Sequence, residues 1–169
     1  MDFDLSDDQV ALRDGARELL DGMSPAIRVR AVAGSDARWD EALWAGMVEQ
    51  GWLGVALPES EGGLGLGAVE LAVLLEEIGR HAAPVPFLST VLAIEAFRSA
   101  GDAATVEQLV QGERIACVAW AHDARERLGP VAFAPVADLA VVVRTDGRSG
   151  TVDAFDLTAA PEARPSAEP

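Results

Sequence analysis

Residues 51–86 read GWLGVALPESEGGLGLGAVELAVLLEEIGRHAAPVP, and this stretch decides the fold of the chain. It joins a glycine-rich loop to a long apolar segment that closes on two spaced prolines, Pro84 and Pro86. Hydrophobic residues cover most of the circumference of segment 68–80, which predicts a helix buried among other helices. Proline interrupts helices, so a second helix is expected to begin only at about Phe87.

The glycines of the loop allow two interpretations. They stand at positions 54, 62, 63, 65 and 67, where they permit positive φ angles and close approach of another chain or a ligand. No Lys-Ser or Lys-Thr follows, and no strand precedes the loop, so it matches neither a phosphate loop nor a dinucleotide fingerprint. A sharp connection between helices is favoured over direct contact with a ligand, and both remain open.

Helix signals recur along the first 112 residues. Ser6 and Gln9 form an S-x-x-Q capping box that starts a helix running to about Asp21. Further helices are expected from Pro25 to Gly34, from near Asp40 to a stop at Gly51, over 68–80 and 87–98, and over about 103–111. Trp39, Trp44 and Trp52 are interpreted as core or interface packing.

The C-terminal end of helix 68–80 carries polar residues. We expect Glu76, Glu77 and Arg80 to mark the exposed end of helix 68–80. His81 follows at the negative end of that helix, where backbone carbonyls can satisfy it, so a structural role is favoured over a catalytic one.

Helix 87–98 combines bulky and small side chains. Leu88, Val91, Leu92 and Phe97 are expected to face inward, with Ser89, Thr90, Ala93 and Ala96 between them. Such alternation either leaves an apolar groove of the kind that substrate pockets need or reflects ordinary close packing.

The pattern changes from helices to strands near Gly112. Apolar runs at 115–121, 139–144 and 151–157 predict three strands, the last two joined by a turn at Asp146-Gly147. The predicted fold is therefore α+β: a helical bundle over 1–112, an incomplete antiparallel β-domain over 113–158, and a tail over 159–169 without a core-forming pattern, expected to be disordered.

Composition excludes several functions. The formal charge is −15, from 28 acidic and 13 basic residues, and every basic residue is arginine. Nucleic acid and anionic membranes are therefore not expected as partners. A single cysteine, Cys117, allows no internal disulfide and, with two histidines, no zinc spacing. Without a leader pattern or an apolar run near 18 residues, a cytoplasmic location is expected.

Three motifs together resemble the acyl-CoA dehydrogenase family: the stretch 51–86, the opening MDFDLSDDQVALRDGARELL, and GERIACVAWA at 112–121. The resemblance covers about two-thirds of the chain and matches the N-terminal helical domain and the start of the middle β-domain. It implies an FAD cofactor and an acyl-CoA substrate, with a base taking the α-proton while the flavin takes a hydride. Members of the family carry a second helical domain after the sheet, which supplies the catalytic glutamate, so no residue here is assigned a catalytic role.

The resemblance also implies site residues. The acyl chain would lie along helix 87–98, bordered by Phe87, Leu88, Val91, Leu92 and Glu95. The flavin would meet main-chain groups of Trp120, Ala121 and His122, which do not depend on side-chain identity. Here Ala121-His122-Asp123 replaces the family's Thr-Glu-Pro, so the hydroxyl donor is lost, and the alternative is that Trp120 fills the place of the ring. Cys117 is expected to be an inert buried thiol, and no metal is expected.

Three hypotheses for function follow. The chain is part of a flavin-dependent acyl-CoA dehydrogenase, supplying acyl-pocket and flavin-binding elements within homo- or hetero-oligomers. Alternatively it is a non-catalytic partner subunit of a heteromeric dehydrogenase, which the altered residues after Trp120 favour. The third hypothesis is an inactive truncated remnant.

Overall fold

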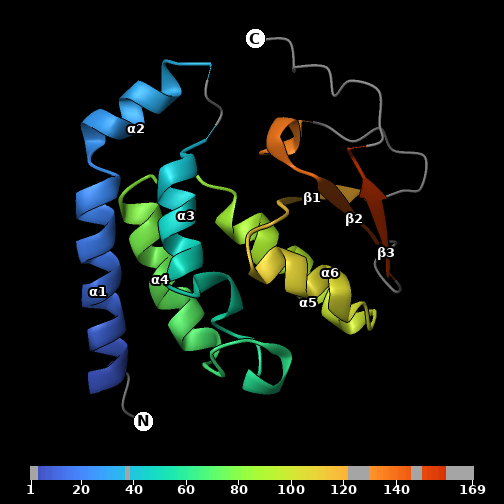
Figure 1. Ribbon diagram of the computed structural model, residues 1–169, viewed down its shortest axis with the longest axis horizontal. Helices are drawn as coiled ribbons and strands as arrows, with labels where there is room; N and C mark the ends of the chain where they lie inside the picture. The colour runs from blue at the N-terminus through green and yellow to red at the C-terminus, as the bar shows by residue number, and fades with distance from the viewer. Residues whose placement is uncertain (1–3, 37–38, 122–129, 146–149, 159–169) are drawn as a thin grey trace. The chain divides into compact units, whose positions relative to one another are not determined.

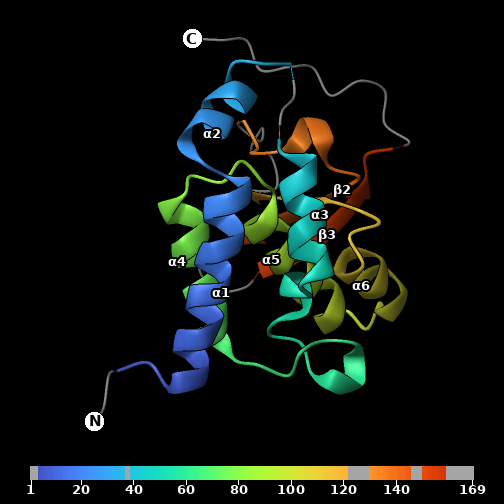
Figure 2. The same cartoon turned by 60° about the vertical axis from the view of Figure 1, so that its left-hand side comes forward.

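The computed structural model describes residues 4–36, 39–121, 130–145 and 150–158. Within them six α-helices precede a three-stranded sheet, which confirms the α+β class (Figure 1; Figure 2). The elements are α1 (Asp7–Met23), α2 (Ala26–Ala33), α3 (Glu41–Glu49), α4 (Ala68–Arg80), α5 (Phe87–Ser99), α6 (Ala103–Val110), β1 (Ala116–Ala121), β2 (Leu139–Thr145) and β3 (Gly150–Asp156), with 3-10 turns η1 (Trp52–Gly54), η2 (Glu59–Glu61) and η3 (Ala134–Val136).

The chain divides into two compact units, residues 1–85 and 86–169. The first unit contains α1 to α4, and the second contains α5, α6 and the sheet. The predicted domain limits at 112 and 158 stay a prediction, and the predicted tail 159–169 lies outside the described residues.

Helices α1 and α4 lie side by side and run in the same direction in the first unit (Figure 1; Figure 2). Their polar contacts advance together along both helices: Gln9 Nε2 to Glu70 at 2.8 Å, Arg17 Nη2 to Glu77 at 2.7 Å, and His81 Nε2 to Asp21 at 3.0 Å. The capping box at Ser6 is confirmed, because the Gln9 amide donates to the Ser6 hydroxyl and the Ser6 amide donates to Gln9 Oε1. Local capping and long-range pairing thus fix the same helix end.

Helix α3 begins where predicted, at an N-cap aspartate. The side chain of Asp40 accepts from the Leu43 amide and pairs with Arg28 Nε at 2.7 Å. Hydrogen bonds from Arg28 are the main reason that the pKa of Asp40 lies below its ordinary value, although burial opposes them. Gly51, with φ 72°, ends the helix as expected.

Hydrophobic side chains from all the long helices of the first unit form its core. Trp44 and Trp52 are each 4% exposed, which confirms their interpretation as core residues, and Trp39 packs edge-on against Trp44 with ring centroids 5.9 Å apart. The core also contains Leu20, Leu43, Met47, Leu53 and Leu74, none more than 1% exposed.

Glu77 is buried, and the prediction that it marks an exposed helix end is wrong. Its side chain is 1% exposed. Arg17 reaches it from α1 with two hydrogen bonds, and Arg80 lies 3.5 Å away on α4. Burial of a carboxylate is tolerated when cations and hydrogen bonds replace its lost water.

The glycine-rich loop folds back on itself. Leu64 donates to the carbonyl of Gly54 at 2.9 Å, and Gly65 donates to that of Leu57 at 2.8 Å. A Cβ added at Gly63 would lie 2.3 Å from the backbone oxygen of Leu57, so only glycine fits there. The chain's own backbone therefore accounts for this glycine, which favours the interpretation as a sharp connection between helices.

Replacing Gly63 by alanine is expected to lower the free energy of unfolding by about 1–3 kcal/mol, because the new Cβ displaces the Leu57 backbone. Gly15→Ala is the matched control: it adds the same atom within α1, where nothing lies within 4 Å. That variant should be neutral or more stable by up to about 1 kcal/mol, since alanine favours helix. Urea denaturation of both variants measures the difference. Equal stability of the two would show that the loop relaxes without cost.

The sheet is mixed, with strand order β1-β2-β3, so the expectation of an entirely antiparallel sheet is wrong. β2 and β3 pair antiparallel, as predicted, whereas β1 and β2 pair parallel. The connection of 17 residues between β1 and β2 is long enough to return the chain to the end of the sheet where β1 begins. There the Leu139 amide donates to the Ile115 carbonyl at 3.1 Å, and the Asp138 carboxylate accepts from the Ile115 amide at 2.8 Å. The predicted turn at 146–149 lies outside the described residues.

Helices α5 and α6 pack together in the second unit, and α5 also packs against β1. Val106 and Leu109 of α6 are buried, as are Ile94 and Phe97 of α5. None of the described helices is both long enough and apolar enough to cross a membrane.

Candidate functional site

The alternation of β1 separates the two described residues predicted to meet a flavin. The side chain of Trp120 is 63% exposed, whereas Ala121 is 1% exposed. In register, Trp120 lies beside Val143 of β2, which lies beside Val152 of β3, so these three side chains share one face of the sheet. The other predicted residue, His122, lies outside the described residues.

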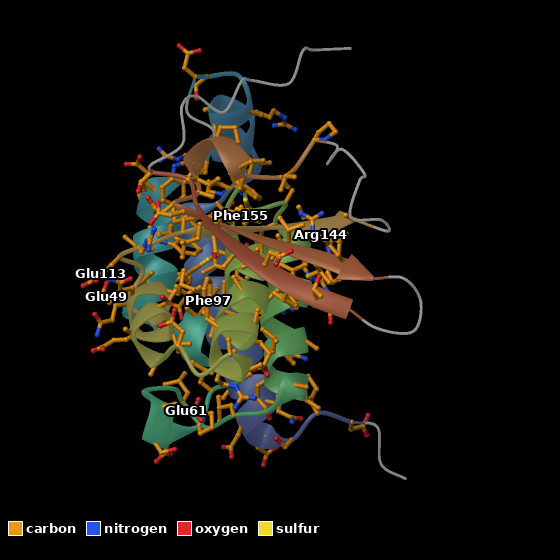
Figure 3. The ribbon with its side chains drawn as sticks, turned by 90° about the vertical axis from the view of Figure 1, so that its right-hand side faces the viewer. Glu49, Glu61, Phe97, Glu113, Arg144 and Phe155 are labelled. Carbon is orange, nitrogen blue, oxygen red and sulfur yellow. The ribbon has the colours of Figure 1, made fainter. Side chains whose placement is uncertain are left out.

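The opposite face of the sheet carries a different set of side chains. Phe155 of β3 is in register with Ala140 and Cys117, and Arg144 of β2 is in register with Ala121. Figure 3 labels Phe155 and Arg144 on the sheet. Phe155 is 47% exposed, and Arg144 Nε lies 3.1 Å from the Asp153 carboxylate. The two large exposed aromatic side chains of the sheet, Trp120 and Phe155, are therefore on opposite faces.

The main chain of Trp120 lies at the open edge of the described sheet. Ile115 accepts from Leu139, so residues 115, 117, 119 and 121 direct their backbone groups toward β2. Ala116, Val118 and Trp120 consequently direct theirs away from β2. A planar ring with hydrogen-bonding edges, such as a flavin, could use the Trp120 main chain, whereas that of Ala121 is committed to β2. Contact of either residue with a flavin stays a prediction.

Helix α5 divides the five predicted acyl-pocket residues between two faces. Phe87 is 1% exposed and Val91 8%, so both belong to the core. Leu88 and Leu92 are 51% and 42% exposed, and the prediction that they face inward is wrong. They stand one turn apart, so they form an apolar strip on the surface of α5. Among the four apolar residues of the predicted pocket, Leu88 and Leu92 are the exposed pair.

Glu95 continues the exposed strip but is already paired. Arg98 donates to both of its oxygens, at 2.7 and 2.8 Å. These bonds hold the pKa of Glu95 below its ordinary value, with burial opposing them. A carboxylate that is ionised and paired with an arginine is a weak base, so Glu95 is better suited to the solvated edge of a site than to taking a proton from a substrate.

Thr90 joins α5 to β1, the two elements that carry the candidate site residues. The sequence pattern indicated only that its small side chain lies between bulky ones. Its hydroxyl is 3.3 Å from the Ala116 carbonyl, to which it donates, and 3.4 Å from the Ala116 amide, from which it accepts. Thr90 and Ala116 are both 0% exposed. The other buried residues of α5 are all apolar. A buried hydroxyl needs a hydrogen-bond partner, so Thr90 is the sequence signal that could have revealed this contact.

Other reactive side chains have structural explanations. Cys117 is 1% exposed, and burial raises the pKa of its thiol, which makes it a poor nucleophile. Among the described residues no group of three His, Cys, Asp or Glu side chains could hold a metal ion.

His81 is held at the end of α4, as expected. Its Nδ1 lies 2.8 Å from the Glu77 carbonyl and its Nε2 lies 3.0 Å from Asp21. Burial lowers the pKa of His81, but the carbonyl and the Asp21 carboxylate outweigh burial and raise it above the ordinary value. Both ring nitrogens are therefore in use, which agrees with a structural role.

A separate open cavity of about 550 Å³ lies in the first unit. It runs along α1 beside Gln50 and Trp52, and its α1 lining is Ala11, Leu12, Gly15, Ala16, Glu18 and Leu19. It contains neither a nucleophile nor an acid paired with a base, so the candidate site remains in the second unit.

The described residues form helices followed by a mixed sheet, and comparisons with known proteins identify the family. The model of the acyl-CoA dehydrogenase N-terminal domain matches residues 6–112. The chain belongs to the acyl-CoA dehydrogenase family.

Individual relatives agree with this membership. The chain is 33% identical over 117 residues to the acyl-CoA dehydrogenase IpdE2 of Mycolicibacterium smegmatis, covering 69% of this chain and 38% of that protein. It resembles the structure of the Tcur3481-Tcur3483 steroid ACAD G363A variant, with 32% identity, a TM-score of 0.71, and coverage of 89% of this chain and 48% of that one. It also resembles the ChsE4-ChsE5 complex from Mycobacterium tuberculosis, with 27% identity, a TM-score of 0.78, and coverage of 93% and 49%. The chain thus spans 38% of the first relative and about half of the two solved chains.

Proposed function

We propose that this chain supplies part of the acyl pocket and part of the FAD-binding sheet of an acyl-CoA dehydrogenase, which removes hydrogen across the α,β-bond of an acyl-CoA thioester. Family membership supports the reaction class. The observation that carries the proposal for this chain is the exposed Trp120, whose main chain lies at the open edge of β1 in the unit that also presents the apolar strip of α5. A cytoplasmic role in lipid catabolism agrees with the reaction.

The residues of the chain would bind and orient rather than react. Leu88 and Leu92 would contact the apolar tail of the thioester, and Glu95 with Arg98 would solvate the rim. Trp120 would offer its main chain to the polar edge of the flavin and its indole to the face of the ring. FAD, when bound, would supply the acceptor for the hydride. The proton acceptor would come from outside the described residues.

Flavin titration tests this function. FAD added to the purified 169-residue chain should bind saturably at micromolar concentration, measured by quenching of flavin fluorescence and by the visible absorption band. Trp120→Ala should weaken binding about tenfold, equivalent to about 1.4 kcal/mol.

The matched control for Trp120 is Phe155→Ala, which removes a similarly exposed aromatic side chain from the opposite face of the sheet. It should leave FAD affinity within about twofold of the wild type. Absence of saturable binding, or an equal loss from both variants, would contradict the proposed flavin contact.

A second candidate function is that of a non-catalytic subunit within a heteromeric dehydrogenase. Two similar solved structures carry two-component names, Tcur3481-Tcur3483 and ChsE4-ChsE5, and the second is described as a complex. The replacement of the family's Thr-Glu-Pro by Ala121-His122-Asp123 also favours it. A candidate full-length dehydrogenase subunit should then gain flavin content or turnover when purified with this chain. Identical flavin content and turnover without the chain would exclude this role.

A further inference from the structure

We propose that Thr90 is a positioning residue: its buried hydroxyl fixes both the rotation of α5 and the position of β1, so that the acyl-facing strip and the flavin-facing strand end keep one relative arrangement. The inference rests on the proposed function and adds to it a residue that contacts neither ligand. The two hydrogen bonds between Thr90 and Ala116 carry it.

The bonds join side chain to backbone in a dry environment. At 3.3 and 3.4 Å both are longer than most hydrogen bonds of their kind, so neither is strong alone. However, Thr90 and Ala116 are 0% exposed, so water cannot replace either bond. A buried amide and carbonyl left without partners are costly, which gives the hydroxyl its importance.

Thr90 determines which side of α5 faces outward. Successive helix residues are separated by about 100°, so Leu88 and Leu92, two positions before and after Thr90, lie about 160° from it around the helix. Because the hydroxyl is tied to the strand backbone, Leu88 and Leu92 are directed away from β1. The exposed fractions of 51% and 42% agree with that rotation.

Thr90 also occupies the same edge of β1 as the candidate flavin contact. Ala116, Val118 and Trp120 direct their backbone groups to this edge, and the hydroxyl takes the first of the three positions. At about 3.3 Å per residue, Trp120 lies roughly 13 Å further along the strand. Apolar contacts alone allow small sliding of a helix over a strand, whereas a donor and acceptor pair specifies one register.

Thr90→Val tests the proposal, because it keeps the shape of the side chain and removes only the hydroxyl. Hydrogen–deuterium exchange of the wild-type chain and this variant should show exchange at β1, residues 116–121, accelerated about tenfold in the variant. FAD affinity should fall about tenfold. Thr90→Ser, which restores the hydroxyl, should recover the slow exchange and most of the affinity.

Thr105→Val is the matched control. It removes a hydroxyl from the same unit, one that donates to Asp102 at 2.7 Å at the start of α6. This variant should change overall stability without altering exchange at β1 or FAD affinity. If Thr90 had only a structural role, Thr90→Val and Thr105→Val would show the same exchange at β1 and the same FAD affinity when compared at equal stability.

The outcomes separate this proposal from the proposed function. Unchanged exchange at β1 in Thr90→Val overturns the positioning role, whatever happens to the flavin. Faster exchange with unchanged FAD affinity also overturns it, because Thr90 would then hold β1 in place without affecting flavin binding. Absence of FAD binding by the wild-type chain overturns the proposed function instead, and the exchange measurements still decide whether Thr90 holds β1.

Discussion

Replacing Phe87 by alanine is expected to lower the free energy of unfolding by about 3–5 kcal/mol, the range for deletion of a buried aromatic side chain. Phe87 is 1% exposed and stands at the first position of α5. Its ring belongs to the same buried face of the helix as Val91 and Ile94. A cavity at this place would loosen the helix that carries the apolar strip.

Leu88→Ala provides the comparison, since the neighbouring side chain is 51% exposed. It should change stability by no more than about 0.5 kcal/mol, as surface substitutions usually do. Thermal or urea denaturation of both variants measures the contrast. If Leu88→Ala destabilised as strongly as Phe87→Ala, the assignment of Phe87 to the core and Leu88 to the exposed strip would be wrong.

The contrast between these neighbours shows what a hydrophobic pattern does and does not determine. Leu88, Val91, Leu92 and Phe97 are all apolar, so the pattern predicted the helix correctly and placed all four facing inward. Which side is buried depends on the elements packed against α5, namely α6 and β1, and the pattern of α5 alone does not reveal them. One such contact comes from Ala116, 26 residues after Thr90.

Local signals were sufficient elsewhere. Ser6 with Gln9 and the N-cap Asp40 specify helix starts through contacts spanning three residues, and both were recognised. Gly51 specifies a helix end through its own φ angle. Parallel pairing of β1 with β2 lacked such a signal, because the strand runs look the same whichever way the chain returns. The candidate site at β1 was predictable only in part, since alternating side-chain exposure along the strand follows from its period, but the partners of Trp120 do not.

The buried Glu77 is the other consequence of long-range packing, and it leads to a second large effect. Arg17→Met is expected to lower the free energy of unfolding at pH 7 by about 2–4 kcal/mol, because it leaves a buried carboxylate with only Arg80 at 3.5 Å. The effect stays below that of a fully enclosed ion pair, since the Arg17 side chain is 40% exposed. Arg13→Met is the matched control: Arg13 pairs with Asp14, whose side chain is 58% exposed, and its loss should cost less than about 1 kcal/mol.

The loss of unfolding free energy in Arg17→Met should be larger at pH 7 than at lower pH. In the wild type, hydrogen bonds from Arg17 hold the pKa of Glu77 below its ordinary value of 4.5, against the opposing effect of burial. The pair therefore stabilises the folded chain above about pH 4.5, and this contribution is lost as the pH falls through the lowered pKa. Without Arg17, burial opposes ionisation of Glu77 with fewer groups to offset it, so protonation at lower pH should relieve the variant.

Urea denaturation of wild type and Arg17→Met at pH 7 and near pH 4.5 measures both effects. The difference between the two proteins should be full at pH 7 and should shrink at the lower pH. Combining Arg17→Met with Glu77→Met should recover much of the loss at pH 7, because no unpaired charge then remains inside. A deficit that equals that of Arg13→Met, or that is the same at both pH values, would mean that α1 and α4 are held together by their apolar faces alone.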